Sequence, residues 1–493
     1  MSCGKTRSFV WRHKQGSSIS MYKLMKTKLV SASRHHPTRG EGAHQFAKEL
    51  AETAELALPM VLTQVGQIAM MTTDIAFIGR ISAEALAAAA LAGRFYLISL
   101  ALGAGLMSAI APLAAQAFGA DNPSIVGRAL RMGLWTALIL SVPIMASALQ
   151  GERILLALGQ DPDVARFAQQ YLSGLAWGAA PALWFLAIRG FMGSVNRPQP
   201  VFWITMAAIP LNALLVYTLT YGKCGLPQLG VFGAGLSTTL VNCGTFLASV
   251  YFAAKRQPFR DYHVFAHLWR FDWPVLRQLI ATGAPISIAS LIESGLFWAA
   301  SLLAGVISTN ALAAHQIAVQ VAAILYMIYF GLSMAAAVRV GHAVGRNDRA
   351  GINRANLAAM LLGVAIAATL TLAVIAARFE IAELFLVGSA DDANATISLT
   401  ARLLLVGAIL FVTDAAQCVA TGSLRGLKDT RMPLLFAAIA WWLIGLSLSY
   451  LLGLKIGLGA VGIWIGLSAG TSVYAALLVL RFQYLATRAC CHS

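Results

Sequence analysis

Twelve apolar stretches follow one another along this chain of 493 residues. Each approaches or exceeds the roughly 20 residues that a helix needs to cross the hydrocarbon core of a bilayer. Only 11% of the residues are charged, against about 25% in an ordinary soluble domain. The chain is therefore predicted to be an all-α membrane protein, which excludes a soluble enzyme, a nucleic-acid-binding domain and a disordered scaffold. The predicted spans are 56–79, 94–118, 128–149, 168–190, 201–222, 229–253, 279–305, 312–338, 355–377, 400–423, 434–453 and 458–480.

The basic residues predict the orientation of these spans. With both termini in the cytoplasm, the cytoplasmic segments hold 28 of the 36 Lys and Arg residues. Basic loops stay cytoplasmic, so the net charge of +16 is interpreted as a topology signal. Residues 1–50 are polar and basic and lack the apolar core of a secretory signal. They are predicted to be a cytoplasmic tail, or an extension upstream of a start at Met21 or Met25.

The chain repeats itself at a spacing of 226 residues, which drifts to 233 further on. The matched pairs include Pro59 and Pro285, Gly79 and Gly305, Gly105 and Gly331, and Gly119 and Gly345. Two six-helix bundles of the same sense are expected, related by a pseudo-two-fold axis along the membrane normal. The predicted parts are a tail (1–50), an N-terminal lobe (51–253), a linker (254–278), a C-terminal lobe (279–485) and a second tail (486–493). Two lobes that face each other across a central cavity predict a transporter in which one lobe rocks against the other.

Two prolines lie at equivalent places in this repeat, Pro59 in the first span and Pro285 in the seventh. A proline inside a helix removes a backbone hydrogen bond and can kink the helix. Paired breaks in corresponding halves of a transporter indicate moving parts. Both prolines are therefore predicted to act as hinges.

Three carboxylates interrupt the apolar spans: Asp74, Glu293 and Asp414. No Lys or Arg is expected at the same depth. A charge at the bilayer centre costs about 3 kcal/mol or more, so such residues are functional candidates. The alternative is that each is neutral or hydrogen-bonded and only holds helices together. A carboxylate without a basic partner can hold a proton, a sodium ion or an organic cation, but hardly two at once, and this competition predicts coupled exchange.

Polar and polarisable side chains lie at helical spacing around these carboxylates. Gln67 and Met70 share a face with Asp74, Gln417 lies one turn after Asp414, and Phe297 lies one turn after Glu293. The eighth span carries a further stripe, made up of Gln316, Gln320, Tyr326 and Tyr329. Aromatic rings attract cations and Met adapts to varied shapes, as a broad-specificity cavity requires. The alternative is that these residues pack helices or contact lipid.

Four segments carry a resemblance to a known family. They are PMVLTQVGQIAMMTTDIAFIG (59–79), PLNALLVYTLTYGKCGLPQLGVFGAG (210–235), IESG (292–295) and DAAQCVATGSLRGLKDTRMP (414–433). The chain resembles the multidrug and toxic compound extrusion (MATE) family, most of all its bacterial NorM-like branch, over about residues 50–485. The resemblance implies twelve helices in two bundles and export of drugs or organic cations against an inward flow of H⁺ or Na⁺.

The same resemblance implies roles for individual residues. Asp74 with Asn212 matches the proton site of the N-terminal lobe, and Glu293 with Asp414 matches the H⁺ or Na⁺ site of the C-terminal lobe. Gln316 falls where some relatives contact substrate. There are two departures: Ala208 replaces a polar residue one turn before Asn212, and Leu410 replaces a frequent Tyr one turn before the tenth-span Asp. The coupling ion stays open, with protons slightly favoured.

Three functional hypotheses follow. The first is a monomeric antiporter of a bacterial inner membrane that exports small cationic or aromatic organic compounds and needs no cofactor besides its H⁺ or Na⁺. The alternative is a related flippase of lipid-linked or polysaccharide precursors, which would favour Arg or Lys in the cavity to bind phosphate. The third, an intramembrane enzyme, is disfavoured because the sequence contains no HExxH and its three intramembrane carboxylates do not form a GxGD-type pair on adjacent helix ends.

Overall fold

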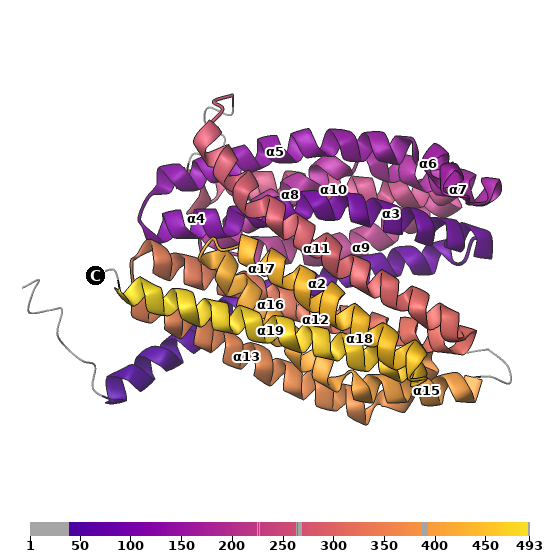
Figure 1. Cartoon of the computed structure of the whole chain (residues 1–493). Helices are drawn as coiled ribbons and strands as arrows, with labels where there is room; N and C mark the ends of the chain where they lie inside the picture. Colours follow the sequence, from indigo (N-terminus) through magenta and orange to yellow (C-terminus); the bar gives the residue numbers. More distant parts are fainter. Residues whose placement is uncertain are drawn as a thin grey trace, which may run out of the picture. The chain divides into compact units, whose positions relative to one another are not determined.

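The computed structural model describes residues 39–223, 225, 227–262, 264, 269–385 and 393–491 (Figure 1). The chain divides into two compact units, Met1–Lys48 and Glu49–Ser493. The predicted N-terminal tail lies largely outside the described residues. Everything below concerns the second unit.

Within the described ranges the secondary structure is helical throughout, without a strand. Ten helices are long and apolar enough to cross a membrane, or twelve if two bent pairs each count as one span. The bends are 48° between α7 and α8 and 45° between α15 and α16. The helices are α2 (Arg39–Ile78), α3 (Ala83–Ser108), α4 (Ile110–Gly119), α5 (Pro123–Leu149), α6 (Gly151–Ala157), α7 (Pro162–Ala176), α8 (Ala179–Ser194), α9 (Gln199–Tyr221), α10 (Gly230–Lys255), α11 (Trp273–Ile307), α12 (Thr309–Gly345), α13 (Arg349–Ala376), α14 (Arg378–Phe385), α15 (Ala393–Val406), α16 (Ala408–Gly426), α17 (Arg431–Ala437), α18 (Ser447–Tyr450) and α19 (Gly459–Cys491). This confirms the predicted all-α membrane fold.

Residues that match in the 226-residue repeat form the same helix caps and turns in both halves of the chain. Ser82 and Ser308 cap α3 and α12, and the side chain of each accepts a backbone N–H bond of 3.0 Å from the residue three positions later. Asp121 and Asn347, which follow α4 and α12, both adopt left-handed backbone conformations, with φ of 51° and 56°. Such caps and turns depend on short polar side chains, so equivalent residues produce equivalent helix ends. We call α2–α10 the N-lobe and α11–α19 the C-lobe.

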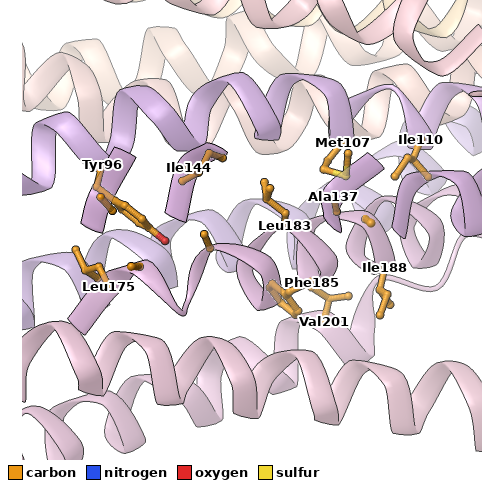
Figure 2. Close-up of a cluster of buried hydrophobic side chains, with 14 of the residues drawn as sticks. Tyr96, Met107, Ile110, Ala137, Ile144, Leu175, Leu183, Phe185, Ile188 and Val201 are labelled. Carbon is orange, nitrogen blue, oxygen red and sulfur yellow. The ribbon is translucent and has the colours of Figure 1, made fainter. Parts of the chain in front are cut away.

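Each lobe has its own apolar core. Figure 2 shows part of the N-lobe core, where Met107 of α3 lies in one buried layer with Leu183 and Ile188 of α8. In Figure 1, α3, α5 and α10 form one group of helices and α13, α16 and α19 form another. A small third core joins the lobes, with Met60 of α2 and Leu332 of α12 among its members.

The middle of α2 and the first turns of α11 pack on the opposite lobe. Leu56 and Ala57 belong to the core shared with α12, whereas Val275 and Leu279 of α11 belong to the N-lobe core. Pro59 and Pro285 follow shortly after these crossing segments, and both helices continue through them. Their role as hinges stays a prediction.

Three helix boundaries differ from the predicted parts. α11 begins inside the predicted linker because Asp272 caps it, accepting the Val275 N–H, and pairs with Arg128 at 2.7 Å. α19 continues through most of the predicted C-terminal tail, and its Arg481 pairs with Asp429 at 2.8 Å. α2 begins well before the predicted first span. Polar partners at helix ends allow each helix to extend past its apolar segment.

The eleventh span is irregular in a way that the apolar pattern did not predict. It runs from α17 into a π-helical segment, η3 (Ala438–Leu446), then α18 and a second π-helical segment, η4 (Leu451–Lys455). π-Helical turns are rare and occur frequently at functional sites. The indole N–H of Trp442 in η3 donates to the carbonyl of Ile292, next to Glu293, at 3.1 Å.

Candidate functional site

Asp74 lies buried in the N-lobe with three helices around it. The side-chain amide of Asn212 on α9 donates to Asp74 Oδ1 at 2.6 Å, and the hydroxyl of Thr238 on α10 donates to Oδ2 at 3.2 Å. The structure thus brings together the predicted pair and adds Thr238, for which the sequence carries no signal. Ala208, at the position of the first departure from the family pattern, is buried and apolar, so it adds no polar group here.

The two predicted substrate residues near Asp74 have different surroundings. Met70 contributes its backbone carbonyl, which accepts a second bond from the Asn212 amide at 3.5 Å. Gln67 points instead toward Arg189 on α8, whose Nη1 donates to Gln67 Oε1 at 3.5 Å and to Gln64 Oε1 at 2.6 Å. The N-lobe therefore holds an arginine among neutral acceptors, near the end of the predicted span 168–190.

Glu293 lies on α11 and lines a small cavity in the C-lobe. Tyr326 on α12 lines the same cavity, and Asp414 on α16 lies near enough to Glu293 for the two charges to interact. Asp414 itself accepts a short hydrogen bond from the Gln417 amide, and both side chains are buried. The structure thus brings Glu293, Asp414 and Gln417 into one polar group.

The cavity beside Glu293 measures about 40 Å³, room for a few waters. A drug-sized guest needs about 300 Å³ or more, so the cavity must widen to admit one. Its walls combine charged, polar and aromatic side chains from five helical spans. The lining comprises Pro285, Ile286, Ala289, Ser290, Glu293, Tyr326, Phe330, Ser333, Gln417, Cys418, Thr421, Arg425, Thr430, Pro433, Trp441 and Tyr474.

Arg425 brings a basic side chain to the cavity that Glu293 lines, which was not expected from the sequence. Its backbone is in the last turn of α16, which made it look like a loop residue, but its side chain lines the cavity with Glu293. Within the described part of the chain, none of Asp74, Glu293 and Asp414 forms an ion pair.

Two other predicted substrate residues lie outside this cavity. Gln316 donates to the Ser301 hydroxyl at 3.3 Å, between α12 and α11. The ring of His315 bridges the same hydroxyl, at 3.1 Å, and the indole N–H of Trp464. Phe297 packs on the C-lobe core. Leu410, at the position of the second departure, is also buried in that core.

Sodium sites use oxygen ligands, and the carboxylates of Glu293 and Asp414 could supply some of them. Among the residues that the structure describes, no three His, Cys, Asp or Glu side chains gather. Any further ligands at this pair would be hydroxyl, amide, carbonyl or water oxygens. Gln417 and Tyr326 already provide such atoms.

The two lobes meet at the end of the molecule where α4, α8, α12 and α16 finish, which we call the basic end. Gly119 lies directly against the backbone carbonyl of His342, and Gly345 lies directly against that of Gln116. The members of each pair lie 226 residues from their counterparts, so the contact is pseudo-symmetric. His342 Nε2 also donates to the Ser194 carbonyl at 2.6 Å, from one lobe to the other.

An ion cluster strengthens the same contact. Arg339 on α12 pairs with Glu49 at 2.7 Å and with Glu52 at 2.6 Å, both on α2. The Arg339 side chain is only 8% exposed, so the cluster is shielded on the arginine side. These contacts hold the basic end closed between the lobes.

Comparison with known sequences shows the family of the chain. The MatE family model matches residues 59–218 and 285–451. A protein of Bradyrhizobium diazoefficiens named as probable multidrug resistance protein NorM is 58% identical over 462 residues, covering 93% of this chain and 99% of that protein. A protein of the same name from Rhodopseudomonas palustris is 52% identical over 437 residues, covering 89% of this chain and 92% of the other.

Comparison with solved structures shows the same fold. The eukaryotic MATE transporter AtDTX14 superposes with a TM-score of 0.80 at 19% identity, covering 90% of this chain and 98% of that one. A MOP superfamily transporter from Pyrococcus furiosus superposes with a TM-score of 0.80 at 18% identity, covering 90% and 96%.

Proposed function

The chain belongs to the MatE family of membrane transporters, and on that basis we propose that it exports organic cations in exchange for inward-moving H⁺ or Na⁺. It is a transporter rather than an enzyme. The names of its relatives support multidrug substrates, and the aromatic side chains around Glu293 favour small cationic or aromatic compounds.

The observation that carries this proposal is the pair Glu293 and Asp414. Asp414 is buried and Glu293 is half-buried, the two carboxylates interact with each other, and neither forms an ion pair in the described part of the chain. Two like charges in a low-dielectric site favour uptake of a cation. H⁺, Na⁺ and an organic cation then compete for the same carboxylates, so binding of one drives release of another. Gln417 belongs to this site as a guest contact.

Asp74 with Asn212 is proposed as a second, proton-binding site. Asp74 accepts hydrogen bonds from Asn212 and Thr238, and it has no basic partner among the described residues. These surroundings support a buried carboxyl group that binds and releases a proton. Gln67 and Met70, on the same helix face, are proposed to contact the guest in the N-lobe. One charge moving down 100 mV releases about 2.3 kcal/mol, enough for a roughly fiftyfold gradient of guest.

Alternating access between the lobes is the proposed route. The pseudo-symmetric contact at the basic end supports a state closed on that side, and opening would separate Gly119 from His342. The Lys and Arg distribution supports a bacterial inner-membrane protein with both termini and the basic end in the cytoplasm. The proposed parts are lobes 51–253 and 279–485 with linker 254–278, in a monomer.

The test is transport by the purified protein in liposomes. Ethidium efflux is followed by fluorescence while a pH gradient or a sodium gradient is imposed alone. The proposal expects uphill ethidium movement with at least one gradient and none without a gradient. Ethidium movement that ignores both gradients would contradict it.

A further inference from the structure

Arg425 is a cation that the proposed exchange does not yet use. It lies in the last turn of α16, and its guanidinium lines the same cavity as Glu293. Its Nε is buried without a hydrogen-bond partner, and within the described residues the guanidinium makes no hydrogen bond or ion pair. Arg425 as a whole is half-buried, but a buried guanidinium nitrogen normally has a hydrogen-bond acceptor, so its Nε is left available to bind one.

The charged and titratable groups that face Glu293 come from three helices. They are Tyr326 on α12, Asp414, Cys418 and Arg425 on α16, and Tyr474 on α19. Of these, Arg425 alone is a cation, so it can attract the Glu293 carboxylate across the cavity that both residues line. An arginine keeps its charge throughout, so this influence is permanent.

Arg425 lies on the side of Glu293 that is nearer the basic end. It lies eleven residues after Asp414, toward the basic end of α16, whereas Glu293 and Asp414 lie deeper. A cation leaving Glu293 toward the basic end passes the guanidinium. As the ion leaves, the carboxylate regains its charge, and a long, unbonded arginine can move closer to it.

We propose that Arg425 is a release residue: its guanidinium competes with the bound ion for Glu293 and so promotes ion release at the basic end. It acts through Glu293 and does not itself hold the ion or the guest. The inference rests on the proposed function, because it assumes that Glu293 carries the exchanged cation. Arg425 then lowers the affinity of the site for every cation, whether H⁺, Na⁺ or an organic cation.

The test is equilibrium binding of ethidium to the purified full-length protein, titrated with pH and with sodium. In Arg425→Gln, ethidium should bind about tenfold more tightly at alkaline pH, as expected when one opposite charge is lost near a carboxylate. The pH of half-maximal binding should rise by about one unit, or sodium should displace ethidium at about tenfold lower concentration. Turnover in liposomes should fall, because release is slower. A merely structural role would weaken binding and turnover together.

Three further variants complete the design. Arg425→Lys keeps the charge and should bind ethidium as the wild type does. Arg431→Gln removes an exposed charge just beyond the same helix end and should change nothing. If Arg425→Gln does not purify as a monodisperse protein, Arg425→Met replaces it, with the same expected gain in affinity.

The outcomes separate the two proposals. In a Glu293→Gln background, Arg425→Gln should no longer change ethidium binding. Unchanged or weaker ethidium binding by Arg425→Gln, or an equal effect in the Glu293→Gln background, overturns the role of Arg425. If instead Glu293→Gln keeps wild-type dependence on pH and sodium, the proposed function itself fails.

Discussion

Arg339 of α12 holds Glu49 of α2 through two donors, its Nε at 2.9 Å and its Nη2 at 2.7 Å, both to the same carboxylate oxygen. Glu52 accepts a further bond from Nη2 at 2.6 Å. This cluster joins the lobes where α2 crosses to the C-lobe. Any motion that opens the basic end has to break it.

Removing both acids should therefore favour the open basic end. The double variant Glu49→Gln, Glu52→Gln leaves a shielded arginine without its partners, a cost of about 2 kcal/mol, or roughly thirtyfold in the closed-to-open ratio. A cysteine introduced at the buried Val338 should then react faster with a maleimide. Glu55→Gln, at an exposed position on the same helix, is the control. Equal labelling of all three proteins would show that the cluster does not hold the basic end closed.

The contact between Gly119 and His342 predicts a steric effect. A Cβ at Gly119 or Gly345 would clash with a backbone carbonyl of the opposite lobe. A backbone carbonyl cannot move aside as easily as the end of a flexible side chain. Gly119→Ala and Gly345→Ala should each lower stability by about 1–3 kcal/mol, read as a lower Tm. Gly93→Ala, whose Cβ meets nothing within 4 Å, should keep or raise the Tm. A Tm unchanged in both interface variants would contradict this close approach.

Asp74 should matter most when protons drive transport. Asp74→Asn keeps the size of the side chain but removes the titratable group, so ethidium efflux driven by a pH gradient should fall at least tenfold. Thr238→Val removes one hydrogen bond that the Thr238 hydroxyl donates to Asp74, and it should lower this efflux only a few-fold. Thr73→Val is the neighbouring control, because its hydroxyl bonds only within α2, to the carbonyl of Ala69. An unaltered pH dependence in Asp74→Asn would remove this residue from the mechanism.

The N-terminal tail should be dispensable for transport. Deletion of residues 1–38 removes the segment before α2 and leaves Asp74 and the Glu49 cluster in place. Efflux per molecule in liposomes should match that of the full chain. A loss of efflux from correctly inserted protein would assign the tail a direct role.

Much of the fold could be predicted because it follows from apolar length and repetition. Each predicted span meets a helix or a bent pair, and the equivalence of Ser82 with Ser308 in the repeat reappears as matching helix caps. The π-helical segment around Trp441 was not predicted, because its composition is as apolar as that of an ordinary span. Helix boundaries were missed where polar partners such as Asp272 extend a helix.

The candidate site could be predicted only in part. The free-energy cost of placing a charged group in the bilayer identified Glu293 and Asp414 as candidates. Helical spacing alone could not predict that Tyr326 faces Glu293 while Gln316 faces Ser301. Arg425 was missed because its backbone position at a helix end hides where a long side chain reaches.

The account depends above all on Glu293 and Asp414 being the exchanged site. The most direct measurement is gradient-driven ethidium efflux from liposomes containing Glu293→Gln or Asp414→Asn, with Glu383→Gln, an exposed acid on α14, as control. We expect both site variants to insert normally and to lose uphill efflux by at least a hundredfold, while the control transports like the wild type. Undiminished uphill efflux in both site variants would contradict the account.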